Sequence, residues 1–366
     1  MSVEKELFNR WKEILVRRYG EGFGEGFVQE AHENLMSTYR MFAGSDCADP
    51  HFIDEVCSSD LNKSAQRLGE VLLYERLLHL GLEPTSKPKG PDFRVEINGR
   101  PVWLELVTPG VGDDNRISDL FSAHNSLYPC AEQAIELRQR SLLRVSNAIS
   151  GKLAKYEDYL RDGVVPPEEP LIIVVNDALL CPDSFFYGIS HNADHGVGGV
   201  SLAEHAVNSI GQSIWVAGEE PGRYAIERTY RDMVDNRPEP KKDGGVRGTV
   251  PVSLFANPTE PHAKAAAERA TIISAVLQIT LREDYGVLMQ LRAKAETEER
   301  LMETIISRGT FVNNPRANNP VGVDVSTLLT TVVVAPTLSP RDLWDLETRR
   351  LKLFLGDVFQ EKPFPS

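Results

Sequence analysis

The sequence predicts an α/β fold in which a mixed central sheet is flanked by helices. Two strand-like runs, 93–97 and 102–107, are separated by Asn98-Gly99, a strong two-residue signal for a β-hairpin. A helical stretch precedes this hairpin, and a longer one follows it and leads into a continuous apolar run at 171–175. Strands and helices in this order form a sheet that is covered by helices.

The N-terminal part of the chain predicts helices. Over the first 60 residues, apolar side chains at helical spacing indicate an arm of two helices, which a glycine-rich segment at 20–26 interrupts. The stretch 64–80 carries a broad apolar stripe. Gly81 follows it at the position where a glycine commonly ends a helix.

The pattern continues beyond the hairpin with a long helix over 129–161, which ends near Gly163 and precedes the apolar strand. The weaker signals beyond residue 180 predict strands over 249–255, 272–280 and 330–334 and an amphipathic helix over 341–355. We therefore expect a helical N-terminal arm (1–60), an α/β core (61–180) and a C-terminal α+β extension packed on the core (181–366).

The composition excludes several classes of protein. With 41% hydrophobic and 25% charged residues in 366, wholesale disorder is excluded. No apolar run approaches the roughly 18 residues of a membrane helix, and no secretory signal is expected. The four cysteines form no CxxC pair, so reduced cytoplasmic thiols are expected. A net charge of −13 excludes a polycation-type nucleic-acid binder, but not an enzyme that meets phosphate through a bound cation and a local basic patch.

Carboxylates are predicted to converge at one end of the hairpin. Asp92 opens the first strand, and Glu105 lies near the end of the second. Trp103, Glu105 and Val107 share one face of that strand, because side chains alternate along it. A third carboxylate, Glu70, arrives from the preceding helix. Oxygen ligands of this kind suit Mg²⁺ or Mn²⁺, and such a cation polarises a phosphodiester.

These residues together resemble a known family. The segments that carry the resemblance are Gly69-Glu70, Gly90-Pro91-Asp92-Phe93, the strand at 102–107, Lys152-x-x-x-Tyr156 and the strand at 171–175. Over residues 64–177 the chain is similar to the PD-(D/E)xK nucleases, which have the restriction-endonuclease-like fold. The resemblance implies metal-dependent hydrolysis of nucleic-acid phosphodiesters. It implies that Asp92 and Glu105 bind the metal, and that Glu70 serves the same metal shell.

The sequence departs from the family pattern at one position. In the family, a lysine two residues after the glutamate positions or activates the attacking water, whereas Val107 stands at that position here. In one interpretation the lysine has migrated to the following helix, where Lys152 is the candidate. Lys155, about 300° further around that helix, is interpreted as a charge pointing in a shifted direction. In the other interpretation the site is inactive, and the fold is a binding or assembly module in a defence or mobile-element system.

The same helix and the loop before the hairpin supply candidates for binding substrate. Tyr156 lies four residues after Lys152 and Arg144 lies eight before it, so all three are expected near one helical face. Lys87 and Lys89 lie just before the first strand, where they are placed to touch a phosphate backbone. The expected partner is a nucleic acid, DNA before RNA. A homodimer or a partner protein is left open, and no membrane partner is expected.

A weaker hypothesis is a hydrolase of another class that uses His191 and His195. These residues have i, i+4 spacing with Asp194 between them, but zinc ligation requires a helix at this point. Glycines follow His195 at once, so a helix is not favoured.

Overall fold

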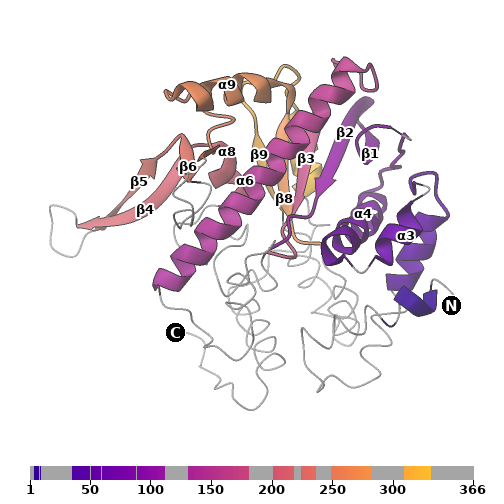
Figure 1. The fold of residues 1–366 in the computed structure, drawn as a ribbon. Coiled ribbons are helices and arrows are strands. Elements are labelled where there is room, and N and C mark those ends of the chain that lie inside the picture. Colours follow the sequence, from indigo (N-terminus) through magenta and orange to yellow (C-terminus); the bar gives the residue numbers. More distant parts are fainter. Residues whose placement is uncertain are drawn as a thin grey trace, which may run out of the picture. The chain divides into compact units, whose positions relative to one another are not determined.

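Two compact units make up the computed structural model of the chain. The structure describes residues 4–7, 9, 35–49, 51–58, 60–87, 89–111, 131–180, 201–217, 224–235, 249–281 and 309–330. The first unit comprises Met1–Arg76, Leu281–Arg308 and Thr330–Ser366, and the second comprises Leu77–Thr280 and Gly309–Leu329. Figure 1 shows the elements along the chain.

The first unit is helical where it is described. Its elements are α3 (Phe52–Val56), most of α4 (Leu61–His79), and the helical residues 4–7 and 35–43. Phe42 packs edge-on against two rings, with centroid distances of 4.7 Å to Phe52 and 5.3 Å to Tyr74. The predicted helix over 64–80 is confirmed as α4, and Gly81 follows it with a φ of 74°, a left-handed conformation that suits glycine.

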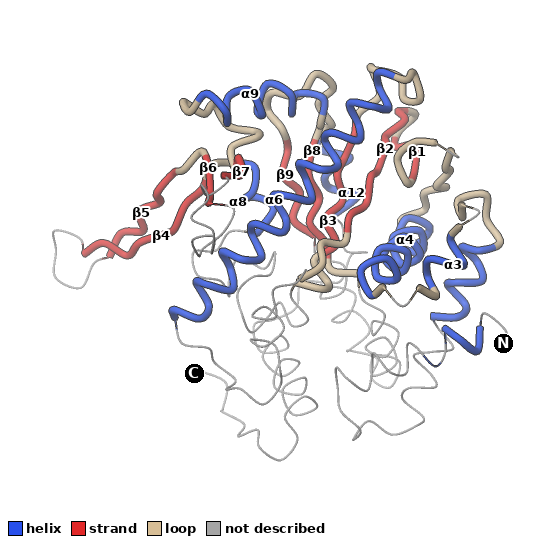
Figure 2. Tube along the Cα trace, in the orientation of Figure 1, coloured by secondary structure: helices blue, strands red, loops and turns tan. Residues whose placement is uncertain are grey.

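The second unit is built on a five-stranded mixed sheet, which confirms the predicted α/β class (Figure 2). Its strands are β1 (Phe93–Ile97), β2 (Arg100–Val107), β3 (Leu171–Asn176), β8 (Ala275–Ile279) and β9 (Gly309–Asn313). They lie in the order β1-β2-β3-β8-β9. The three central strands are parallel, and each edge strand runs antiparallel to its neighbour.

The predicted hairpin is confirmed. Asn98 and Gly99 have φ values of 53° and 73°, so both central residues of the turn are left-handed. Two such residues match the right-handed twist of the flanking strands. The turn fixes the register, in which Phe93 lies opposite Leu104. Glu105 follows Leu104 directly and lies two residues before the end of β2.

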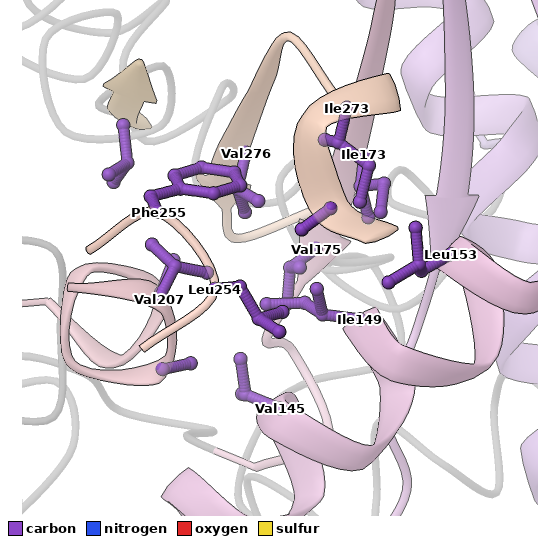
Figure 3. Packing of buried hydrophobic residues seen from close by; sticks show 14 of the residues in the cluster. Val145, Ile149, Leu153, Ile173, Val175, Val207, Leu254, Phe255, Ile273 and Val276 are labelled. Atoms are coloured by element: carbon purple, nitrogen blue, oxygen red, sulfur yellow. The ribbon is translucent and has the colours of Figure 1, made fainter. Parts of the chain in front are cut away.

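The helices of the second unit include α6 (Ala131–Arg161), α8 (Leu202–Val207), α9 (Pro261–Arg269) and α12 (Val323–Thr330). Both α6 and α8 contact the central sheet. The long helix α6 crosses one face of the sheet, as predicted for residues 129–161 (Figure 1). Figure 3 shows Ile149 and Leu153 of α6 in one hydrophobic cluster with Ile173 and Val175 of β3. This packing fixes the helix over the sheet, and with it the polar side chains that α6 carries.

The core between α6 and β3 predicts a large effect for one substitution. Ile173 is fully buried at the centre of the sheet. We expect Ile173→Ala to lower the free energy of unfolding by about 2–5 kcal/mol, because it removes buried apolar area and leaves a cavity. Chemical denaturation measures this loss. Val323→Ala is the control, since Val323 is 79% exposed. A loss below about 1 kcal/mol at Ile173 would contradict the packing described here.

The C-terminal half contributes strands to the central sheet. The strand predicted over 272–280 is confirmed as β8, preceded by a 3₁₀ turn at Ala270–Ile272, and β9 beside it was not predicted. The predicted run 249–255 contains only the short β7 (Thr249–Pro251), which pairs with β6 (Met233–Asp235). The central sheet therefore includes strands from beyond residue 180.

Other expectations for this half differ from the structure or lie outside it. Thr330 ends α12, whereas a strand was expected to begin there; residues 331–334 and the predicted helix over 341–355 lie outside the described residues. An antiparallel ribbon of β4 (Ile210–Ala217) and β5 (Tyr224–Tyr230) was not predicted. Among the described residues, no helix is long and apolar enough to cross a membrane.

Candidate active site

Glu105 is the centre of the candidate site. Its side chain is only 1% exposed, within a strand whose neighbouring residues are apolar and buried. Burying a carboxylate is costly unless it is paired with a positive charge. Two ammonium groups from α6 provide that pairing, because Lys152 Nζ and Lys155 Nζ donate to Glu105 Oε1 over 2.6 and 2.9 Å.

The geometry of α6 explains why both lysines reach one oxygen. Each residue turns an α-helix by about 100°, so Lys155 lies about 300° after Lys152, which is only about 60° back from it. Residues three apart therefore share a face. Glu105 meets that face because its neighbours on the same side of β2 pack towards α6: Trp103 belongs to the cluster that includes α6 residues, and Val107 packs against that cluster. The interpretation of Lys155 as a charge in a shifted direction is wrong.

The second oxygen of Glu105 is different. Oε2 is buried, and none of the described residues forms a hydrogen bond with it. An unpaired buried carboxylate oxygen costs about 1–3 kcal/mol or more. A buried polar atom of this kind indicates a partner that is not part of the protein chain, such as a bound water or a cation.

Asp92 brings a second carboxylate to this end of β2. It immediately precedes β1, and continuing the register of the hairpin places it opposite Glu105. Its Oδ2 accepts a hydrogen bond from the backbone N–H of Leu106 over 2.7 Å. The negative charge of Asp92 also acts on Lys155 and Tyr159 of α6. The structure thus brings Asp92, Glu105 and the two lysines together.

Lys155 also contacts Tyr159, one turn further along α6. Its Nζ lies 5.3 Å from the centre of the Tyr159 ring. Burial acts to lower the pKa of Lys155, but the charge of Glu105 and the hydrogen bond to it outweigh burial and raise this pKa above its usual value. Burial, and then the charge of Glu105, raise the pKa of Tyr159. Lys155 is therefore positively charged and Tyr159 neutral at pH 7.

Tyr156, a predicted substrate-binding residue, lies in the hydrophobic core. It is 1% exposed and belongs to the cluster between α6 and the sheet. Its hydroxyl donates to the backbone carbonyl of Glu169 over 3.5 Å, and burial is the main cause that raises its pKa. The i, i+4 spacing from Lys152 is real, but the two side chains have different surroundings, since Lys152 reaches Glu105.

The contacts of the other predicted substrate-binding residues do not involve Glu105. Arg144 donates through Nε and Nη2 to the backbone carbonyl of Val111. Lys87 donates to the backbone carbonyl of Val164 and lies over the ring of Trp103 at 5.1 Å. Lys89 is exposed. A role in binding phosphate stays a prediction for these three residues.

Glu70, the predicted third carboxylate, belongs to the first unit. It is buried on α4, where its Oε2 accepts from Arg67 Nη1 over 2.8 Å and its Oε1 accepts from Gln66 over 3.3 Å. Arg67 also pairs with Asp49 and Glu55, so an acidic cluster surrounds this guanidinium group. A role for Glu70 at the metal stays a prediction.

The chemistry of the site suits a hard divalent cation. Among the described residues, no group of three or more His, Cys, Asp or Glu side chains is arranged to hold a metal. Mg²⁺ does not require such a group, because it keeps several waters and is commonly bound by one or two carboxylates together with substrate phosphates. Asp92 and the unpaired oxygen of Glu105 fit this mode of binding.

Two members of the site, Lys155 and Tyr159, were missed as functional residues. The signal that could have found them is the spacing of positions 152, 155 and 159, which lie i, i+3 and i+7 on one helical face. The predicted buried Glu105 required a positive partner, and both lysines of α6 lie within this face.

A separate charged cluster lies near the start of β2 and β3. Glu169 accepts two hydrogen bonds from Arg94 and one from the indole N–H of Trp103 over 2.6 Å. The hydrogen bonds from Arg94 are the main cause that lowers the pKa of Glu169, which burial opposes. A lowered pKa in the folded state means that the ionised form stabilises the fold.

This cluster predicts a pH-dependent contribution to stability. The stabilisation by ionised Glu169 is fully present above 4.5, the usual pKa of this carboxyl group. It is lost as the pH falls through the lower pKa that Glu169 has in the folded state. We therefore expect Glu169→Gln to be less stable than wild type at pH 7, by a difference that narrows below pH 4.5. Urea denaturation at several pH values measures this. The exposed neighbour Glu168 provides the control, Glu168→Gln. A difference between wild type and Glu169→Gln that stays constant down to pH 3 would refute the assignment.

Comparison with known proteins does not classify the chain: no protein-family model, curated protein or solved structure matches it. The histidine pair of the weaker hypothesis, His191 and His195, lies outside the described residues.

Proposed function

We propose that the protein is a metal-dependent nuclease of the PD-(D/E)xK type, which hydrolyses nucleic-acid phosphodiesters. One observation carries the proposal. Glu105 is buried with one oxygen held by Lys152 and Lys155, while its other oxygen has no partner among the described residues and Asp92 lies beside it. Two carboxylates with a lysine are the side chains that this reaction requires.

The fold supports this proposal at a coarse level. An antiparallel hairpin, a long covering helix and a strand parallel to the second hairpin strand follow one another in the second unit. This order places both carboxylates near the carboxyl end of β2, under α6. We propose in addition that this core is restriction-endonuclease-like, and that the lysine missing at position 107 has been replaced by one on α6.

The residues of the site have distinct roles in the proposed reaction. Asp92 and Glu105 would hold Mg²⁺ or Mn²⁺. The cation supplies positive charge that polarises the phosphodiester and acidifies a water. Lys152, which is 16% exposed, fixes the orientation of Glu105 through its 2.6 Å hydrogen bond. Its charge also favours the negative charge that develops on the phosphate in the transition state.

A second candidate function is a catalytically inactive member of the same fold that acts as a binding or assembly module. The observation that favours it is the balance of charge, since the two carboxylates and two ammonium groups cancel without any cation. A valine at position 107 is also what this candidate predicts.

Nuclease assays on the full chain separate the two candidates. The substrates are single- and double-stranded DNA and RNA, each with Mg²⁺, Mn²⁺ or EDTA, and DNA is the substrate expected to be cut first. Cleavage that requires the divalent ion and disappears in Glu105→Gln supports the nuclease. Binding of Mn²⁺ or nucleic acid with no cleavage of any substrate supports the inactive module.

A further inference from the structure

Two lysines share one oxygen of Glu105, but they are not equivalent. The side chain of Lys152 is 16% exposed, whereas that of Lys155 is 47% exposed. Lys152 also makes the shorter hydrogen bond, 2.6 Å against 2.9 Å. Since Lys152 alone already pairs with Glu105, Lys155 is the lysine that can move into solvent without leaving a buried charge unpaired.

Among the residues that the structure describes, the charges around Glu105 leave no surplus negative charge for a divalent cation. Asp92 and Glu105 contribute two negative charges, and Lys152 and Lys155 contribute two positive ones. Adding two further positive charges within a few ångströms of two ammonium groups is unfavourable, because like charges repel strongly where water is excluded. A divalent cation therefore binds well only when a lysine moves away or when an anion enters with the cation.

Lys155 and Tyr159 are arranged to receive such an anion. The ammonium group of Lys155 lies over the ring of Tyr159, 5.3 Å from its centre, and the charge of Asp92 acts on both groups. Together they offer a positive charge and a hydroxyl donor at the partly exposed edge of the site. Phosphate oxygens accept charge-assisted hydrogen bonds from such groups.

We propose that Lys155 couples the binding of a divalent cation to the binding of phosphate at this site. Lys155 pairs with Glu105 in the absence of the cation, and moves to a phosphate oxygen beside Tyr159 when a cation engages Glu105. The ligand class is a phosphate mono- or diester with Mg²⁺ or Mn²⁺. The inference rests on the proposed metal site, but it does not require that the phosphodiester be cleaved.

Binding of Mn²⁺, followed by its electron paramagnetic resonance signal, tests this coupling without any reaction. The titration is made with and without inorganic phosphate, below the concentration at which manganese phosphate precipitates. In wild type we expect phosphate to tighten Mn²⁺ binding by about tenfold, which lies within the usual range for coupled sites. Thermodynamic reciprocity requires Mn²⁺ to tighten phosphate binding by the same factor.

The variants assign the coupling to named residues. Lys155→Ala should bind Mn²⁺ alone several-fold more tightly than wild type, because a competing positive charge is gone, and phosphate should then have little effect. Lys155→Gln is a second variant that keeps the length of the side chain. Tyr159→Phe should bind Mn²⁺ alone as wild type does and lose part of the phosphate effect. The control is Lys264→Ala, on the exposed face of α9, which should match wild type in both titrations.

Two results would overturn the inference. One is that both Lys155→Ala and Lys155→Gln match wild type in the two titrations, and the other is that phosphate leaves the Mn²⁺ affinity of wild type unchanged.

The test of this inference can be told apart from the test of the proposed function. Coupled binding without cleavage of any nucleic acid would leave the inference standing and refute the nuclease. Mn²⁺-dependent cleavage, together with Lys155 variants that match wild type in both titrations, would support the nuclease and refute the inference.

Discussion

Replacing Glu105 by glutamine is expected to lower metal-dependent cleavage by at least about 10³-fold. The change removes one of two carboxylates that would hold the cation, and the cation contributes several kcal/mol to the stabilisation of the transition state. A neutral amide keeps the shape of the side chain, so the loss reports charge and ligation rather than volume. Single-turnover cleavage with saturating Mn²⁺ measures the effect.

The same substitution is also expected to destabilise the fold. Repulsion between Asp92 and Glu105, considered alone, predicts unchanged or higher stability when one charge is removed. The structure reverses that sign, because Glu105 is paired with two lysines and Lys152 is mostly enclosed. Leaving this ammonium group without its partner costs about 1–3 kcal/mol, less than for a fully buried pair because the lysines reach the edge of the site.

Glu96 on β1 provides the matched control, because it is exposed on the same hairpin. Glu96→Gln should keep both activity and stability. Cleavage that persists in Glu105→Gln alongside a lowered free energy of unfolding would assign Glu105 a purely structural role. Unchanged stability with lost cleavage would mean that the ion pairs contribute little to folding.

The second large effect is expected for Lys152→Ala, which should slow cleavage by roughly 10²- to 10³-fold. That factor is typical of removing one fixed electrostatic donor from an active site. The affinity for Mn²⁺ should stay the same or rise slightly, because Lys152 is a competitor for Glu105 and not a ligand of the cation. Measuring Mn²⁺ affinity beside the cleavage rate therefore separates a catalytic role from loss of the metal.

Lys155→Ala is not a neutral control for this experiment, because Lys155 contacts the same oxygen of Glu105. Lys264→Ala serves instead, as it removes the same charge from an exposed position on α9. If Lys152→Ala cleaves at the wild-type rate, the cation with its carboxylates suffices, and the lysine has not taken over the role missing at position 107.

The central hairpin and its neighbours could be predicted because their signals are local. Asn98-Gly99 adopts the left-handed pair of φ values that asparagine and glycine tolerate better than other residues, and it joins two strand-forming runs. The fully apolar run of β3 and the long periodicity of α6 are similarly plain in sequence. The placement of Glu105 also follows from local pattern, since a charge within an apolar strand must meet a partner.

The rest of the sheet depends on contacts that no local pattern specifies. Gly309–Asn313 is a short edge strand, and its pairing with β8 is set by the whole sheet. The site shows the same limit. Tyr156 and Tyr159 are three residues apart on α6, but Tyr156 is buried in the core, whereas Tyr159 packs at its edge and contacts Lys155.

The pairing of β3 with β8 has a consequence for biosynthesis. About a hundred positions separate the two partners, as in the contact between Ile173 and Val276. A nascent chain that has formed β1, β2 and β3 leaves one hydrogen-bonding edge of β3, which is apolar at every position before Asn176, exposed until β8 leaves the ribosome. Open apolar edges pair readily with other chains, and distant pairings form slowly. Overexpression should therefore produce aggregates from incomplete or slowly folding chains, and chaperone supply or lower temperature during synthesis should raise the soluble yield.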